Sequence, residues 1–112
     1  MELVTESINN ATVVTPKSRH LDATNAAEFR RQMATEVAGS GQVVLALDHV
    51  EFLDSAGLGS LLSLLRRLTA DGGDLRLCGV SPSVGALLQL VRLDQVIQIF
   101  ESREEAAHSF DG

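Results

Sequence analysis

The stretch QVVLALDHVEFLDSAGLGSLLSLLRRL, residues 42–68, carries the clearest structural pattern in the chain. It opens with five apolar residues, 43–47, which lack polar alternation and are therefore typical of a strand buried on both faces. Leucines at positions 58, 61, 62, 65 and 68 then recur at helical spacing. The segment between them, residues 48–54, leaves the carboxyl end of the strand, where open α/β sheets place their functional sites.

The N-terminal part of the chain predicts a hairpin followed by a helix. Residues 2–8 and the β-branched run 12–15 flank Asn9-Asn10, a turn signal. Apolar residues at positions 26, 29, 33 and 37 then fall at helical spacing, and Gly39 and Gly41 end this helix. Its start has the capping-box pair Asn25 and Glu28, with Asp22 or Thr24 as alternative caps.

The C-terminal part predicts a strand, a helix, a short strand and a last helix. Residues 75–80 are a second apolar strand, after Gly72-Gly73. Ser81-Pro82 is a helix start, and Val84, Leu87, Leu88 and Val91 form the apolar side of that helix, mainly as core. Residues 96–100 fit a short strand, and the capping box Ser102–Glu105 opens a helix through Phe110.

This element order predicts one α/β domain over residues 1–112. Strands that alternate with helices favour a largely parallel sheet with right-handed crossovers, and the hairpin makes the sheet mixed. We expect four or five strands and about four helices.

Composition narrows the function classes. The chain has 112 residues and a net charge of −6, and a negative chain is repelled by nucleic-acid phosphates and anionic lipid. It has neither Trp nor Tyr, and its single cysteine, Cys78, excludes an internal disulfide and favours a buried core thiol. There is no membrane-spanning or signal-like stretch, so the expected location is the cytoplasm.

Residues 53–60, LDSAGLGS, carry the candidate site. Ser55 is expected at a helix N-terminus, where free backbone N–H groups and the helix dipole favour an anion. Gly57 and Gly59 each cost about 1 kcal/mol relative to Ala in a helix, so propensity does not explain them. One interpretation is that Asp54 or Ser55 is merely an N-cap and that the glycines allow close packing. The other is that Ser55 offers an accessible hydroxyl.

Several chemistries are excluded or disfavoured at this hydroxyl. Leu53 stands where a hydrolase nucleophile elbow has its first glycine, and no phosphate-binding loop is present. His20, His49 and His108 share no metal-ligand spacing and are expected to be solvated. Covalent phosphorylation or protein binding at Ser55 remains. Ser60 is expected to be structural, and Arg66-Arg67 fits a solvated helix face better than a contact patch.

Asp54-Ser55-Ala56-Gly57-Leu58-Gly59 resembles the D-S-[SA]-G-[LI]-G signature of STAS domains, in particular the bacterial anti-sigma factor antagonists. The resemblance covers nearly the whole chain. Residues 19–23 resemble the family's G-x-L-D-A loop, so Asp22 matches its aspartate. Residues 73–84 resemble its fourth strand and third helix. Leu93-Asp94, Ile99-Phe100 and the Ser-x-x-Glu-Ala stretch 102–106 resemble its tail. Arg19 departs from the usual Gly, and Ala56 replaces a second serine that many members have.

The resemblance implies a partner switch without enzymatic activity or cofactors. An antagonist of this family binds an anti-sigma factor that is also a GHKL-type serine kinase. The kinase phosphorylates the serine that matches Ser55, which releases the complex, and a PP2C-type phosphatase restores binding. The residues implied in partner binding are Asp22, Asp54, Ser55, Ala56, Gly57, Leu58 and Gly59. Arg19 would strain its loop if the family's Gly has a positive φ.

Two alternatives from other classes remain open. One is a non-phosphorylated STAS adaptor subunit of a transporter, against which the Asp54-Ser55 pair argues. The other is a module that binds a nucleotide or small ligand at the same helix end, against which the missing phosphate-binding loop argues.

Overall fold

The chain begins with the predicted hairpin. In the computed structural model, which describes residues 1–111, β1 (Leu3–Ile8) and β2 (Ala11–Pro16) pair antiparallel, with Ile8 opposite Ala11. Asn9 and Asn10 form the turn with φ values of 51° and 68°. Asparagine tolerates this left-handed region better than most residues, which explains the Asn-Asn pair here.

Three further strands extend the sheet on one side of the hairpin. β4 (Gln42–Ala46), β6 (Asp74–Cys78) and β7 (Gln98–Phe100) lie parallel to β2, and the order is β1-β2-β4-β6-β7. This confirms the predicted α/β fold with a mixed, largely parallel sheet. A separate pair, β3 (His20–Leu21) and β5 (Phe52–Leu53), is parallel and was not predicted, because two residues carry no periodic pattern.

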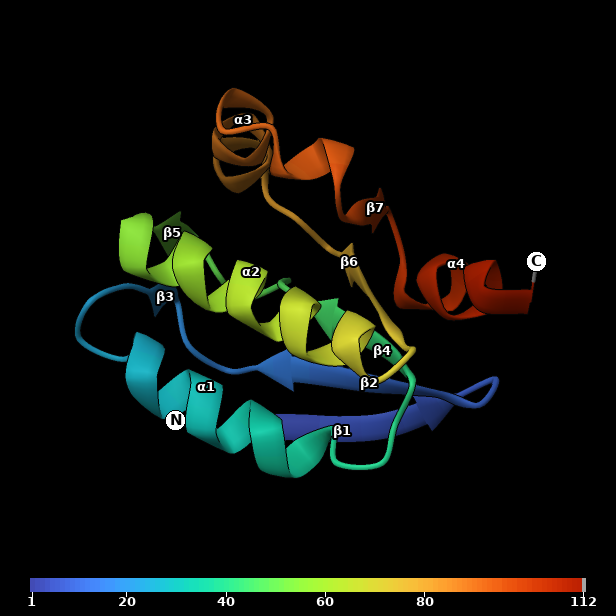
Figure 1. The fold of residues 1–112 in the computed structure, drawn as a ribbon. Helices are drawn as coiled ribbons and strands as arrows, with labels where there is room; N and C mark the ends of the chain where they lie inside the picture. Colours follow the sequence, from blue (N-terminus) through green and yellow to red (C-terminus); the bar gives the residue numbers. More distant parts are fainter. Residues whose placement is uncertain (112) are drawn as a thin grey trace.

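Residues 1–111 form four helices, as predicted, and three of them cover the faces of the sheet (Figure 1). α1 (Ala26–Glu36) and α2 (Ser55–Ala70) lie side by side on one face, and α4 (Arg103–His108) lies on the other. α3 (Pro82–Leu90) and the 3₁₀ turn Leu93–Gln95 stand beyond the end of β6. A last 3₁₀ turn, Ser109–Asp111, follows α4.

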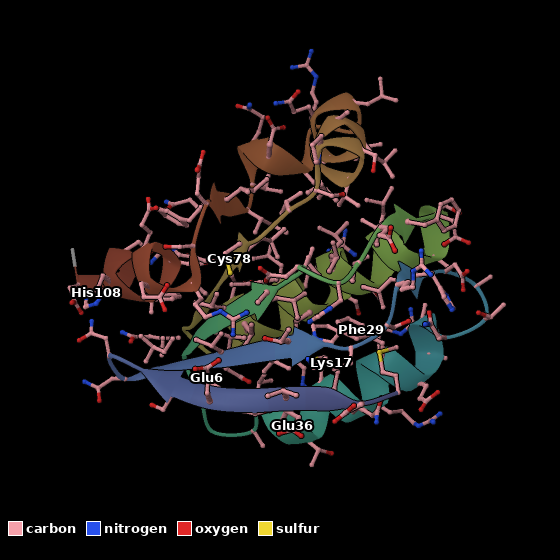
Figure 2. All side chains as sticks on the ribbon, turned by 180° about the vertical axis from the view of Figure 1, so that it is seen from behind. Glu6, Lys17, Phe29, Glu36, Cys78 and His108 are labelled. Atoms are coloured by element: carbon pink, nitrogen blue, oxygen red, sulfur yellow. The ribbon has the colours of Figure 1, made fainter. Side chains whose placement is uncertain are left out.

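The central strand β4 is buried on both faces, as its apolar run predicts. Val43 and Leu45 pack in the cluster under α1 and α2, which also contains Phe29 and Leu61. Alternate residues of β4 face α4 in a second cluster, whose members are mostly small: Ala11, Val13, Val44, Ala46, Cys78, Ala106 and Ala107. Small side chains let the short α4 approach the sheet closely, and Figure 2 shows Cys78 on this side of the molecule.

The structure confirms three helix starts or stops and corrects others. Ser81 and Ser102 accept backbone N–H groups of Val84 (3.3 Å) and Glu105 (3.1 Å), and α2 ends before Gly72, at φ +83°. The Asn25–Glu28 capping box is wrong. The Asn25 side chain does not cap α1, and the Glu28 carboxylate binds the amino group of Met1.

Two apolar stripes also differ in detail from the prediction. In α2 the fully packed leucines are Leu61, Leu64 and Leu68, so Leu64 takes the place expected for Leu62. In α3 the predicted core residue Val91 is 45% exposed, because the helix ends at Leu90 and the chain turns away there. Within residues 1–111, no helix is both long enough and apolar enough to cross a membrane.

Candidate functional site

Ser55 is the first residue of α2, directly after β5 and at the end of the loop that leaves the central strand. Its side chain is exposed, and among residues 1–111 its hydroxyl makes no hydrogen bond. The position is therefore the accessible one that the sequence suggests. The structure confirms Asp54 as the N-cap of α2, and the alternative that Ser55 is the cap is wrong.

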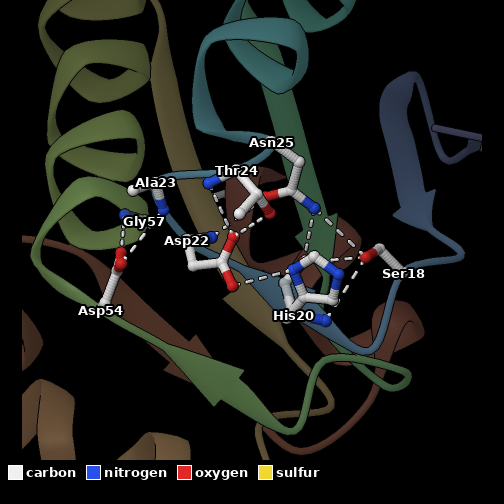
Figure 3. Close-up of polar contacts among 8 residues, drawn as sticks. All are labelled: Ser18, His20, Asp22, Ala23, Thr24, Asn25, Asp54 and Gly57. Atoms are coloured by element: carbon white, nitrogen blue, oxygen red, sulfur yellow. Dashed lines mark hydrogen bonds and ion pairs between the residues drawn. The ribbon is translucent and has the colours of Figure 1, made fainter.

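The Asp54 carboxylate joins two segments that are far apart in sequence (Figure 3). Its Oδ1 accepts the backbone N–H of Gly57 at 3.0 Å, which caps α2. Its Oδ2 accepts the backbone N–H of Ala23 at 3.0 Å, which ties the loop before α1 to the start of α2. Both carboxylate oxygens thus build the site frame, and neither depends on the Ser55 side chain.

The two glycines of α2 have different environments. A Cβ on Gly57 would lie 2.1 Å from the carbonyl oxygen of Leu21, so only glycine allows α2 to approach β3 this closely. A Cβ on Gly59 would meet nothing within 4 Å, and Gly59 is exposed. Packing within the chain therefore explains Gly57 and leaves Gly59 unexplained.

The loop that Asp54 holds is ordered by its own side chains (Figure 3). Asp22 Oδ1 accepts both the N–H (2.9 Å) and the hydroxyl (2.5 Å) of Thr24, and Asp22 Oδ2 lies 3.1 Å from His20 Nδ1. The Thr24 hydroxyl is the main cause that lowers the pKa of Asp22 below its usual range. Asn25 Oδ1 in turn accepts the Asp22 N–H at 3.0 Å.

Asp22 therefore has a structural role in this loop whatever else it does. Its main-chain carbonyl also accepts the N–H of Ala26 at 2.8 Å, at the first residue of α1. Neither Asp22 nor Thr24 caps α1 with its side chain, so both alternative caps are wrong. The Asp22 side chain keeps 20% of its surface exposed, so part of the carboxylate remains accessible.

Arg19 fits its loop without backbone strain. It is not among the residues with positive φ, and its carbonyl oxygen accepts the N–H groups of Glu51 (2.7 Å) and Phe52 (3.2 Å). Its exposed side chain pairs with the Glu51 carboxylate at 2.5 Å, which raises the pKa of Arg19 through hydrogen bonding and charge attraction. The departure from the family's usual glycine is accommodated here.

The remaining predicted site residues separate into buried and exposed groups. Ser60 is buried and donates to the Gly57 carbonyl at 2.6 Å, which confirms its structural role. Gly57 is buried, and Ala56 and Leu58 are partly buried, with Leu58 packed against the core. Sequence reasoning missed the exposed Ser63, although it continues the spacing of four residues from Ser55 and Gly59 on one face of α2.

The described residues offer little for metal or thiol chemistry. In residues 1–111, no group of three or more His, Cys, Asp or Glu side chains could hold a metal ion. His49 Nε2 lies 3.3 Å from Lys17 Nζ at the surface. Cys78 is 1% exposed, and burial raises the pKa of its thiol to about 11, which agrees with an inert core residue.

Comparisons with known proteins agree on one family. The family model described as "STAS domain" matches residues 2–106. A protein of Thermotoga maritima, named as a candidate anti-sigma factor antagonist, is 28% identical over 96 residues, covering 84% of this chain and 85% of that protein. The anti-sigma F factor antagonist of Paenibacillus polymyxa is 33% identical over 64 residues, which cover 57% of this chain and 55% of the relative.

Solved structures share the fold. An anti-sigma-factor antagonist (STAS) domain protein from Planctomyces limnophilus superimposes with a TM-score of 0.88, at 23% identity and 98% coverage of both chains. The Bacillus cell fate determinant SpoIIAA in its phosphorylated form gives a TM-score of 0.70 at 22% identity, with 99% of this chain and 100% of that chain covered.

Proposed function

Because the chain belongs to the STAS domain family, we propose that it is an anti-sigma factor antagonist that is switched by phosphorylation of Ser55. In this proposal the unmodified chain binds an anti-sigma factor that is also a GHKL-type serine kinase, in the cytoplasm. The names of its relatives support the antagonist role. The observation that carries the switch is the exposed Ser55 hydroxyl, which makes no hydrogen bond within residues 1–111.

In this proposal other enzymes carry out both the phosphorylation and the dephosphorylation of Ser55. In the kinase, the Ser55 oxygen attacks the γ-phosphorus of ATP, the bond from this phosphorus to ADP breaks, and a base of the kinase accepts the serine proton. A PP2C-type phosphatase reverses the change with water, which yields serine and inorganic phosphate. The chain is therefore a substrate and a binding partner, and no catalytic residue of its own is needed.

Electrostatics explain how one phosphate separates the partners. A phosphate adds about −1.5 to −2 charges at pH 7. It would stand next to Asp54 on a chain that already carries a net charge of −6, so an acidic or closely packed partner surface would be repelled. The N-terminus of α2 favours the same charge, so the fold tolerates it.

The proposed contact surface is smaller than the sequence motif. Ser55 and Gly59 are exposed on one face of α2, and Asp22 and Ala56 are partly accessible beside them. Gly57 and the two hydrogen-bonded oxygens of Asp54 form the frame beneath this surface. Gly59 would then be glycine so that the partner's backbone can come close to α2.

Mass spectrometry of the intact protein after incubation with ATP and an extract of the native host tests the modification. We expect one phosphate, located on Ser55 by fragmentation and absent from Ser55→Ala. Ser63 is the matched control, since it is an exposed serine on the same face of the same helix but two turns further in. A phosphate on Ser63, or on any serine with Ser55 unmodified, would overturn the site.

A further inference from the structure

A groove runs between α1 and α2, on the side of these helices that faces away from the sheet. Its volume is about 570 Å³, and residues of both helices line it. Phe29, Met33 and Leu64 lie at its floor as part of the core, with only 0–6% of their surface exposed, so the apolar surface that the groove offers comes mainly from Ala27 and Ala34. The groove is therefore a fixed feature of the helix pair.

The rim of this groove is positive on an otherwise acidic chain. Arg30 and Arg31 of α1 and Arg67 of α2 line it, and none of the lining residues is acidic. All three are exposed, and none forms an ion pair with another of residues 1–111. Arg31 lies close enough to Glu28 to help lower the pKa of that carboxyl. The three guanidinium groups together still mark a local field of the opposite sign on a chain of net charge −6.

Small residues keep the groove open along its length. Ala27 and Ala34 lie about two turns apart on α1, and Ser63 stands opposite on α2. Long apolar side chains at these positions would fill the space. A groove between two helices, lined by small apolar residues and by charged side chains, is a surface that can receive an amphipathic helix.

We propose that the groove between α1 and α2 binds an acidic amphipathic segment of a partner protein. The apolar side of this segment would contact the two alanines of α1 that line the groove. Its carboxylates would pair with Arg30, Arg31 and Arg67, whose planar guanidinium groups bind a carboxylate through two parallel hydrogen bonds. Ser63 lies about 12 Å along α2 from Ser55, so the site is separate from the phosphorylation site. This proposal does not need Ser55 to be phosphorylated.

Site-specific photo-crosslinking in an extract of the native host identifies the occupant. A photoreactive amino acid with a compact diazirine side chain, chosen so that it does not fill the groove, replaces Ser63. The matched control carries it at Thr69, which is exposed on α2 but does not line the groove. Mass spectrometry then sequences the crosslinked peptide. We expect a peptide from another protein that is rich in Asp and Glu and has apolar residues at helical spacing, with a yield above that of the Thr69 control.

A synthetic copy of the crosslinked peptide then tests the arginines. We expect its dissociation constant to rise at least about fivefold for the double variant Arg30→Gln/Arg67→Gln and to stay within twofold for Arg66→Gln. Arg66 is exposed on the same turn as Arg67 but does not line the groove. Ser55→Asp should leave the affinity for this peptide unchanged, which separates this proposal from the proposed function.

Several outcomes would overturn the proposal. These are equal yields at Ser63 and Thr69, the absence of any product, a crosslinked peptide without acidic residues, and a product from a lipid or from a second copy of this chain. Loss of affinity in Arg66→Gln to the same degree as in the double variant would also do so. Thermal melts of all variants check that the exposed substitutions leave the fold intact.

Discussion

Ser55 stands free because its neighbours make the contacts that the turn requires. Asp54 caps α2 and holds Ala23, Gly57 lets the helix approach Leu21, and the Ser60 hydroxyl binds back to its own helix. The charge on residue 55 can therefore change without a hydrogen bond being broken. Because Ser55 makes no contact that the fold requires, a substitution at Ser55 can test partner binding separately from stability.

Ser55→Asp should weaken binding to the anti-sigma factor at least about tenfold, which corresponds to about 1.4 kcal/mol, and leave the melting temperature nearly unchanged. The added charge sits beside Asp54 at the proposed interface, whereas the helix N-terminus favours it within the fold. Ser83→Asp is the control, because Ser83 is an exposed serine in the first turn of α3. Calorimetric titration and thermal melts measure both effects. Equal affinity of Ser55→Asp and wild type would count against the switch.

Gly57→Ala and Gly59→Ala should shift stability in opposite directions. At Gly57 the new methyl group meets the Leu21 backbone, and overpacking of this kind costs about 1–3 kcal/mol of unfolding free energy. At Gly59 the methyl group meets open space, so the better helix propensity should stabilise the chain by about 0.5–1 kcal/mol. Urea unfolding measures both values. If Gly59→Ala leaves partner affinity intact, the proposed contact at Gly59 is wrong.

At the scale of elements, the site is made by the two loops that lead from strands of the sheet to the helices α1 and α2. The loop before α1 and the loop before α2 are held together by the β3–β5 pair and by Asp54. Asp22 orders the first loop through Thr24 and His20. Its contribution to stability should therefore depend on pH.

Asp22→Ala should destabilise the chain near neutral pH, and this difference should fade in acid. The pKa of Asp22 in the fold lies below its ordinary value of 3.8, chiefly because the Thr24 hydroxyl donates to the carboxylate. Such a group stabilises the fold above its unfolded pKa and loses that effect as pH falls through the folded pKa. Thermal melts from neutral pH to about pH 3 measure the difference. Thr24→Val should reproduce part of it, and a difference that does not change with pH would contradict the assignment.

The sequence predicts the long elements of this fold well and the short ones poorly. The apolar run at residues 43–47, the leucine stripe of α2 and the Ser81 and Ser102 caps each carry a local physical signal. The β3–β5 pair and the bond from Ala23 to Asp54 join segments about 30 residues apart, and no local pattern records them. Exposure of Ser55 could be predicted from its place at a helix start. The different roles of Gly57 and Gly59 could not, because they depend on where Leu21 lies.

At the scale of the whole molecule, the sheet packs against a large hydrophobic cluster under α1 and α2 and against a small one under α4. The cluster under α4 consists mostly of small residues, and Cys78 is one of its members. Because α4 has only six residues, this layer depends on close contact and not on buried area. The single thiol therefore reports whether the layer stays closed.

Cys78 should react with a disulfide reagent at pH 8 at least about 100-fold more slowly in the folded chain than in urea. A thiol pKa of about 11, against an ordinary 9.0, lowers the thiolate fraction about 100-fold at this pH, and burial adds to the protection. Absorbance of the released reagent gives the rate. Fast labelling of the folded chain would mean that α4 opens readily, and the single variant Ala107→Ser tests whether α4 packing controls that rate.

The double engagement of Asp54 also bears on the timing of the signal. The N–H groups of Gly57 and Ala23 already donate to this carboxylate. A phosphate on Ser55 therefore gains no hydrogen bond from these two groups by moving toward them. The modified and unmodified chains should then share one backbone, so no slow rearrangement would separate message from response. The delay between modification and response would then depend only on the turnover of the kinase and phosphatase and on the dissociation rate of the partner. Once the phosphate is removed, the chain would return at once to its unmodified conformation.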